Sequence, residues 1–150
     1  MRTYAVGDLH GNYKGLLQAI ERSPFNPNED KLITIGDYID GGNHIEVLPI
    51  MEYLLKLPNW IGIIGNHDAW MLEAINDGWT FIVDIWYRQG GRQTLDSLGI
   101  GNHLAYSTVG GSQQVLGRVF GGDCPPLCKR FLESLKLYHI DDNNNAYVHA

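Results

Sequence analysis

The chain has 150 residues, a length that fits one domain with a hydrophobic core of its own. Its 44% hydrophobic and 19% charged residues exclude a disordered chain, and no apolar run is long enough to cross a membrane. The net charge of −6 argues against nucleic acid as a partner, because nucleic-acid binders usually present a basic surface. We therefore expect a single domain over residues 1–150, with neither nucleic acid nor membrane as a partner.

The first half of the chain alternates short β-rich segments with segments whose apolar residues recur at helical spacing. The predicted strands are residues 3–7, 31–35 and 60–64, and the predicted helices follow Asn12, cover 45–57 and begin near Ala69. Such alternation predicts parallel strands joined by right-handed crossovers. In sheets of this kind, ligands bind beyond the carboxyl ends of the strands.

The second half of the chain is less regular. Its predicted elements are helices on both sides of Gly90–Gly91, loops or a short hairpin over 101–126, a helix over 131–137, a turn over 141–145 and a strand from Ala146. The two cysteines, Cys124 and Cys128, are too few for a zinc site of four ligands. We expect free thiols and, since the N-terminus does not resemble a secretory signal, a cytoplasmic protein.

Polar residues follow each of the predicted strands in the first half of the chain, and a histidine ends the last one. They are Asp8 and His10, Asp37 and Asp40, Asn66, His67 and Asp68, and finally His149. Each of them alone has a more ordinary interpretation, as a helix cap or a surface residue. Neighbouring strands lie only about 4.8 Å apart, however, so that these groups can converge. Together they predict a site for Mn²⁺, Fe or Zn²⁺, which accept carboxylate, amide and imidazole ligands.

These strand-end motifs resemble those of the calcineurin-like metallophosphoesterases, and within that family the phosphoprotein phosphatases of bacteria and bacteriophages. The family pattern is GDxHG, GDxxDRG, GNH followed by an acid, and HAG. This chain has GDLHG at 7–11, GDYIDGG at 36–42, GNHD at 65–68 and VHA at 148–150. The resemblance implies an α/β fold in which two mixed β-sheets form a sandwich flanked by helices.

The resemblance also implies a dinuclear metal centre, for which we favour Mn²⁺ over Fe or Zn²⁺. Asp8 and His10 would bind the first ion, Asp37 would bridge both ions, and Asn66 and His149 would bind the second. The implied reaction is hydrolysis of a phosphomonoester by direct attack of a metal-bridging hydroxide. Its favoured substrate is a serine or threonine phosphoprotein, and a small phosphoester is the other partner that fits.

Three further residues take roles from the same resemblance. His67 would protonate the leaving oxygen, and Asp40 would hold the imidazole of His67 in place. Asp68 has two interpretations: an acid follows GNH in relatives, but its position also suits a helix cap.

The chain departs from the family pattern at two points. Gly41 stands where the family has an arginine that grips the phosphate, and we name Arg88 and Arg92 as replacements, with solvated helix charges as their alternative. The family also has a histidine ligand downstream of HAG, whereas this chain stops at Ala150. We therefore expect an amino-terminal portion of the fold that binds the first ion better than the second.

Two other functions stay open from the sequence. The chain could hydrolyse dinucleoside polyphosphates or nucleotides on the same scaffold, although symmetrical tetraphosphatases often replace the residue at Asp40. It could also be an inactive fragment that binds metal or a partner, which the missing histidine and Gly41 would favour.

Overall fold

The computed structural model describes residues 1–42, 44–77, 80–100 and 122–150. At its centre is a parallel sheet in the order β1 (Thr3–Val6), β2 (Lys31–Ile35) and β3 (Trp60–Ile63). Its register aligns Val6 with Thr34 and Thr34 with Gly62. The three strands therefore end at the same edge, as the sequence predicted.

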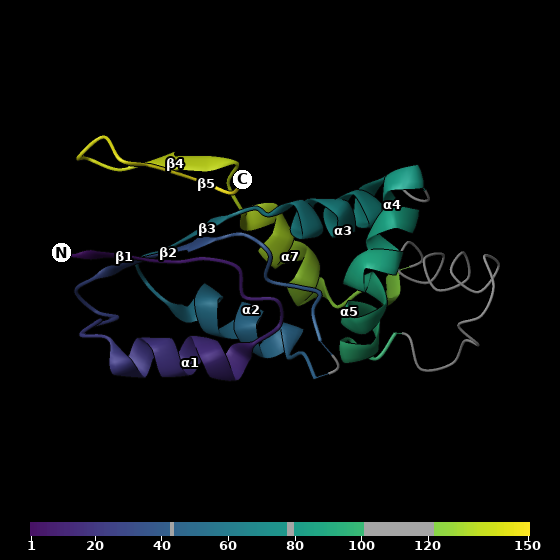
Figure 1. Ribbon diagram of the computed structural model, residues 1–150, viewed down its shortest axis with the longest axis horizontal. Coiled ribbons are helices and arrows are strands. Elements are labelled where there is room, and N and C mark those ends of the chain that lie inside the picture. Colours follow the sequence, from purple (N-terminus) through teal and green to yellow (C-terminus); the bar gives the residue numbers. More distant parts are fainter. Residues whose placement is uncertain (43, 78–79, 101–121) are drawn as a thin grey trace.

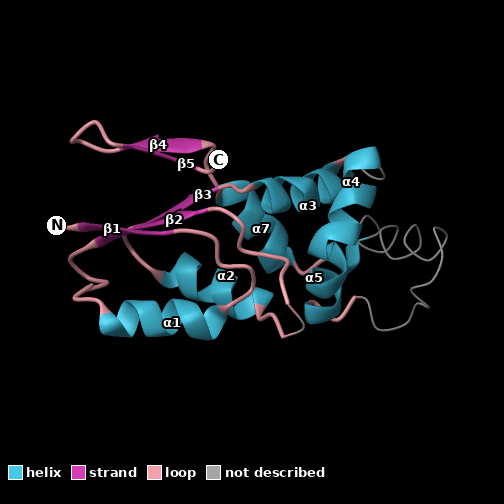
Figure 2. Ribbon diagram, viewed as in Figure 1, coloured by secondary structure: helices cyan, strands magenta, loops and turns pink. Residues whose placement is uncertain are grey.

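Two layers cover the faces of this sheet (Figure 1). On one face lie α1 (Tyr13–Arg22) and α2 (Val47–Lys56), and on the other lies the antiparallel hairpin of β4 (Tyr138–Ile140) and β5 (Ala146–Val148). Helix α1 begins as predicted, because the side chain of Asn12 accepts a hydrogen bond from Gly15 N. Figure 2 shows the hairpin stacked over the central sheet, so the chain forms two layered sheets with α1 and α2 on the outer side of the central one.

The remaining helices gather beyond the carboxyl ends of the central strands (Figure 1). They are α3 (Asn66–Asn76), α4 (Phe81–Trp86), the π-type turn η1 (Tyr87–Gly91), α5 (Arg92–Ser97) and α7 (Pro126–Ser134). Helices α4 and α5 confirm the prediction of helices on both sides of Gly90–Gly91. Residues 101–121 of the predicted loop lie outside the described residues.

Two helices differ by three residues or more from their predicted bounds, while α2 is only slightly shorter than the predicted 45–57. Helix α3 begins at Asn66 rather than near Ala69, because the carboxylate of Asp68 accepts Gly65 N at the start of the helix. Helix α7 covers Pro126–Ser134 rather than 131–137. The helix starts earlier because proline suits a first helical position. It ends earlier because Lys136 forms backbone hydrogen bonds with Gly62 O and Ile64 N beside β3.

The core joins the sheet to the helices at its carboxyl edge. Phe131 on α7 meets Tyr38 edge-to-face at 4.9 Å and stacks on Trp60 at 5.3 Å. Trp86, Tyr38 and Phe131 are the largest fully buried side chains among the described residues.

Three further observations bear on the predictions from the sequence. The central sheet is parallel and the hairpin is antiparallel, and Cys124 and Cys128 are free thiols. None of the described helices has the length and hydropathy to cross a bilayer.

Candidate active site

The loops that follow β1 and β2 are held against each other by backbone hydrogen bonds. Leu9 N and His10 N both donate to Asp37 O, at 3.0 and 2.7 Å. His10, Asp37 and Asp40 all have positive φ, at 42°, 50° and 60°. Such backbone conformations are costly for residues with a side chain, and they persist where the surroundings impose them. The strained residues are three of those that the sequence singled out.

The structure brings Asp8, His10 and Asp37 together. One carboxylate oxygen of each aspartate and one ring nitrogen of His10 lie within 4.8 Å of one another. His10 Nδ1 is 3.1 Å from the carbonyl oxygen of Ile39, to which it can donate, while Nε2 lies 3.7 Å from Asp37 Oδ2. In that tautomer Nε2 carries a lone pair, which is the form of histidine that binds metals.

His149 and Asn66 extend this cluster on the other side of Asp37. His149 Nδ1 is 3.0 Å from Ile35 O, while Nε2 is 3.1 Å from Asn66 Oδ1 and 3.6 Å from Asp37 Oδ2. If Nδ1 donates to the carbonyl, the lone pair of Nε2 faces two acceptor oxygens with no proton between them. A cation fits such a set of donors, and imidazole, amide and carboxylate are suitable ligands.

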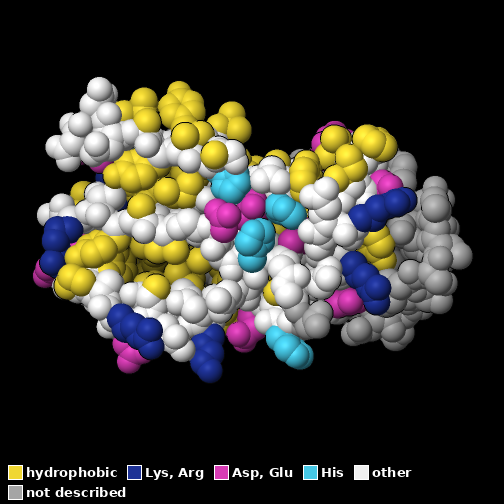
Figure 3. Space-filling model, in the orientation of Figure 1, with side chains coloured by type: hydrophobic (Ala, Val, Ile, Leu, Met, Phe, Trp, Pro, Cys, Tyr) yellow, Lys and Arg dark blue, Asp and Glu magenta, His cyan; other side chains and the backbone are white. Residues whose placement is uncertain are grey.

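Gly36 makes the approach of His149 possible. Its φ is +78°, and a Cβ at this position would overlap the imidazole of His149. Figure 3 shows the outcome on the surface, where histidine and acidic side chains gather on one face of the molecule. The five residues predicted as metal ligands thus lie together in the structure: Asp8, His10, Asp37, Asn66 and His149.

His67 and Asp40 form a hydrogen-bonded pair beside these ligands. His67 Nδ1 lies 2.6 Å from Asp40 Oδ2, and the imidazole meets that of His10 edge-to-face at 5.4 Å. The hydrogen bond to Asp40 raises the pKa of His67, whereas partial burial opposes this rise. Burial also raises the pKa of Asp40, and its hydrogen bonds from His67, Thr94 and Trp86 oppose that rise. We assign the shared proton to His67, because the other donors already face the carboxylate oxygens.

Asp68 combines the two interpretations that the sequence left open. Its carboxylate is fully buried and accepts Gly65 N at 2.9 Å, which caps α3. The same group accepts Asp37 N at 2.8 Å and Tyr38 N at 3.0 Å, so it also holds the loop that carries Asp37. Burial raises the pKa of Asp68 to about 7.

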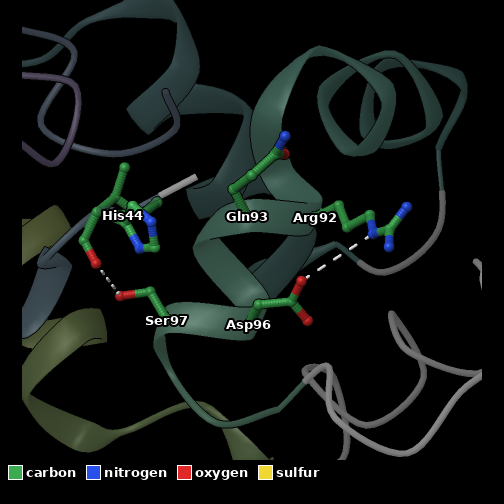
Figure 4. A pocket seen from close by; sticks show the side chains of 6 residues that line it. His44, Arg92, Gln93, Asp96 and Ser97 are labelled. Carbon is green, nitrogen blue, oxygen red and sulfur yellow. Dashed lines mark hydrogen bonds and ion pairs between the residues drawn. The ribbon is translucent and has the colours of Figure 1, made fainter. Parts of the chain in front are cut away.

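The structure places Arg88 and Arg92 each in an ion pair with an aspartate four positions away along the chain. Arg88 lies 3.0 Å from Asp84, and Arg92 lies 4.0 Å from Asp96. Arg92 lines a polar cavity of about 480 Å³ with His44, Gln93, Asp96 and Ser97 (Figure 4). Phosphate binding by Arg88 and Arg92 remains a prediction.

Gly41, which stands in place of the arginine of the family pattern, cannot accept a side chain without rearrangement. Its φ is +144°, and a Cβ there would lie 2.6 Å from the carbonyl oxygen of His10. The local backbone therefore differs from one that displays an arginine.

Two contacts of Asp40 could not be expected from the sequence. Trp86 Nε1 donates to Asp40 Oδ2 at 2.9 Å, and the hydroxyl of Thr94 donates to Oδ1 at 2.5 Å. These residues lie 46 and 54 positions from Asp40, within helices that no motif connects to it.

Comparison with known proteins decides the family. The profile of the calcineurin-like phosphoesterases matches residues 1–148. The chain belongs to this family. Structural comparison agrees on the fold: a serine/threonine phosphatase from Saccharomyces cerevisiae superposes with a TM-score of 0.54 over 96% of this chain and 36% of its own, at 16% identity.

Two curated relatives of this calcineurin-like chain represent different activities. Serine/threonine-protein phosphatase 2 of Salmonella typhimurium is 40% identical over 91 residues, which are 59% of this chain and 38% of the relative. A symmetrical bis(5'-nucleosyl)-tetraphosphatase of Dechloromonas aromatica is 34% identical over 82 residues, which are 54% of this chain and 29% of the relative. The matches thus span well under half of each relative's length.

Proposed function

We propose that this chain hydrolyses phosphomonoesters with the aid of two divalent metal ions, and that its substrates are proteins phosphorylated on serine or threonine. The observation that carries the proposal is the convergence of Asp8, His10 and Asp37, whose ligand atoms lie within 4.8 Å of one another. Asn66 and His149 adjoin the same cluster. Membership of the calcineurin-like phosphoesterases supports this reading of the cluster.

The ligands divide between two ions in the way that the sequence motifs suggest. Asp8 and His10 would hold the first ion, Asn66 and His149 the second, and Asp37 both. When bound, two such ions lower the pKa of the attacking water and neutralise charge on the phosphoryl oxygens. We favour Mn²⁺, and the same ligand types also suit Fe and Zn²⁺.

His67 supplies the proton that the reaction needs. With Nδ1 bonded to Asp40, the opposite ring nitrogen, Nε2, is left to donate a proton to the leaving oxygen. The hydrogen bond to Asp40 raises the pKa of His67, and this favours the protonated imidazole. The serine of a phosphoprotein is a poor leaving group unless it is protonated, so this donor suits that substrate class.

Hydrolysis of dinucleoside tetraphosphates is the second candidate, because a relative at 34% identity has that activity in its name. Asp40 favours the first candidate, since symmetrical tetraphosphatases often have another residue there. Rates on a phosphoserine peptide and on diadenosine tetraphosphate, measured with Mn²⁺, would separate the two. A higher kcat/KM on the tetraphosphate would contradict our assignment of the substrate.

Two variants test the assigned roles. In Asp37→Asn we expect Mn²⁺-dependent turnover to disappear, because the bridging carboxylate has lost its charge. In His67→Asn we expect turnover of the phosphopeptide to fall by about 10²–10⁴-fold, the usual contribution of a general acid. Full activity of either variant would contradict its role. The exposed His44 lies outside the site, and His44→Ala serves as the control.

A further inference from the structure

The carboxylate of Asp40 receives more hydrogen bonds than a role as partner of His67 requires. It is 1% exposed and accepts from His67 Nδ1, Trp86 Nε1 and the hydroxyl of Thr94. The Thr94 hydroxyl also accepts Asp40 N at 2.9 Å, so its own proton is directed to Asp40 Oδ1. Thr94 thus binds one carboxylate oxygen and Trp86 the other, which fixes the carboxylate against rotation.

The backbone between Trp86 and Thr94 is shaped to allow this arrangement. In an unbroken helix, residues eight positions apart would be separated by about 12 Å along the axis and could not meet one carboxylate. The π-type turn η1 interrupts the helix, and Gly90 takes φ +127° within it. Gln89 and Gly90 both leave the helical backbone conformation, so the chain kinks here between two helices.

The two glycines of η1 pack against Asp40 and Trp86. A Cβ at Gly90 would lie 2.7 Å from the Cβ of Asp40, and one at Gly91 would lie 2.6 Å from the indole of Trp86. The turn therefore packs directly around the Asp40 carboxylate, with Trp86 before it and Thr94 after it.

We propose that Trp86 and Thr94 are positioning residues that hold Asp40 and, through it, fix the imidazole of His67 for proton donation. The inference rests on the proposed function, because it concerns the proton donor of that reaction. As the bond between phosphorus and the leaving oxygen breaks, its electron pair stays on that oxygen, which takes the proton from His67 Nε2. The proton on Nδ1 stays in its hydrogen bond to Asp40, and Nε2 regains a proton from water. Small displacements of such a donor have large effects, since about 1 Å can cost 10²-fold in rate.

The first test compares leaving groups in Thr94→Val, which removes one donor and keeps the shape, and in Trp86→Phe, which removes the other donor together with part of the ring. We expect kcat on a phosphoserine peptide to fall about tenfold or more, because the alkoxide leaving group needs the proton. On dinitrophenyl phosphate we expect less than about a threefold change, because that phenolate leaves without protonation. Thr94→Ser keeps the hydroxyl and should restore the rate on the peptide.

The second test does not depend on turnover. The proton shared by His67 and Asp40 lies in a 2.6 Å hydrogen bond and should give a separate, far-downfield proton NMR signal. His67→Asn assigns this signal by removing it. We expect Thr94→Val and Trp86→Phe to shift the signal or broaden it, and Thr94→Ser to leave it near its original position.

The chain contains a matched control for both tests. Trp60 Nε1 donates to Thr34 Oγ1 at 2.8 Å, so another tryptophan and another threonine form a side-chain hydrogen bond that does not involve Asp40. Thr34→Val and Trp60→Phe should lower stability without changing the ratio of the two substrates or the NMR signal. If Thr94→Val lowers both rates equally, or leaves the signal unchanged, the positioning role is wrong. If the parent chain hydrolyses neither substrate, the proposed function fails and the NMR test alone decides the positioning role.

Discussion

Asp68 is the residue through which two separate loops of the candidate site are joined. Its carboxylate accepts Asp37 N and Tyr38 N from the loop after β2, and Gly65 N from the loop after β3. A neutral side chain with a single oxygen has two lone pairs and could not satisfy all three donors. Asp68 therefore sets the relative positions of Asp37 and Asn66 without being one of the proposed ligands.

The first prediction concerns Asp68→Asn. We expect a loss of about 1–3 kcal/mol in the free energy of unfolding, because the new amide group faces buried backbone donors and leaves at least one unsatisfied. Urea denaturation measures the change. Asp77→Asn, at the exposed end of the same helix, serves as the control and should have little effect. Equal stability of Asp68→Asn and the parent chain would contradict the role of Asp68 as a clamp.

The second prediction separates two adjacent glycines. Gly41→Ala should destabilise the fold by about 1–3 kcal/mol, because φ is +144° and the new Cβ would press on His10 O. Gly42→Ala should be close to neutral, since nothing lies within 4 Å of a Cβ there. Thermal unfolding of the two variants would show the contrast, and a neutral Gly41→Ala would disprove the strain argued for this position.

Sequence reasoning at the residue scale could predict which side chains lie close together where a motif follows a strand. Asp8, Asp37 and Asn66 each stand within a few residues of a strand end, and the parallel register of the sheet then brings them together. Trp86 and Thr94 could not be found in this way. Their link to Asp40 depends on how a helical pair folds back over the loop, which no short-range pattern encodes.

The connection between α1 and β2 is held by a buried carboxylate, that of Asp30. It accepts Asn26 N and also binds Arg2 through the backbone and the guanidinium. Hydrogen bonds from Asn26 and Arg2 lower the pKa of Asp30 from 3.8 to about 2. The charged form is therefore the one that the folded chain stabilises.

The third prediction follows from the sign of this shift. A lowered pKa adds stability above the unfolded-state value of 3.8, and this contribution is lost as the pH falls from about 4 to about 2. Asp30→Asn should therefore be less stable than the parent chain at pH 6, and the difference should shrink across that acidic range. Chemical denaturation at pH 6, 4 and 3 measures it, and a difference that stays constant with pH would contradict the assignment.

The fourth prediction concerns the break between α4 and α5. Gly90 and Gly99 both have positive φ, at +127° and +74°, but only Gly90 has a neighbour where a Cβ would stand. Gly99→Ala should cost about 1 kcal/mol, the usual penalty at such a helix end. Gly90→Ala should cost more and should also disturb Asp40, which lies against it. Equal losses in unfolding free energy would mean that the turn is not packed on Asp40.

At the scale of helices and strands, the sequence best predicted the elements whose bounds are set by neighbouring residues in the chain. Short β-rich segments that end at glycine predicted the three central strands, and the capping side chain of Asn12 predicted the start of α1. The structure contains all of these elements. Strand β4 was not predicted, although the equally short β5 was. The start of α3 was also set by a tertiary contact, since Asp68 serves both its own helix and the neighbouring loop.

For the molecule as a whole, the proposed ligand cluster joins segments from both ends of the chain. Asp8 follows the first strand and His149 follows the last, and the two approach to 3.9 Å. Without cations, the carboxylates of Asp8 and Asp37 repel each other across this junction. An ion that binds only the folded chain shifts the unfolding equilibrium by mass action, by about 2.7 kcal/mol at a concentration of 100 Kd.

The fifth prediction is therefore that Mn²⁺ raises the melting temperature of the chain, while a chelator reverses the rise. Asp37→Asn should abolish most of this rise, because it removes the negative charge of the carboxylate that we propose as a ligand of both ions. In metal-free buffer the same variant should be at least as stable as the parent chain, because the repulsion between Asp8 and Asp37 is gone. This reversal of order with Mn²⁺ distinguishes loss of a ligand from general damage to the fold. If the parent chain and Asp37→Asn respond equally to Mn²⁺, the ions bind elsewhere and the proposed centre is wrong.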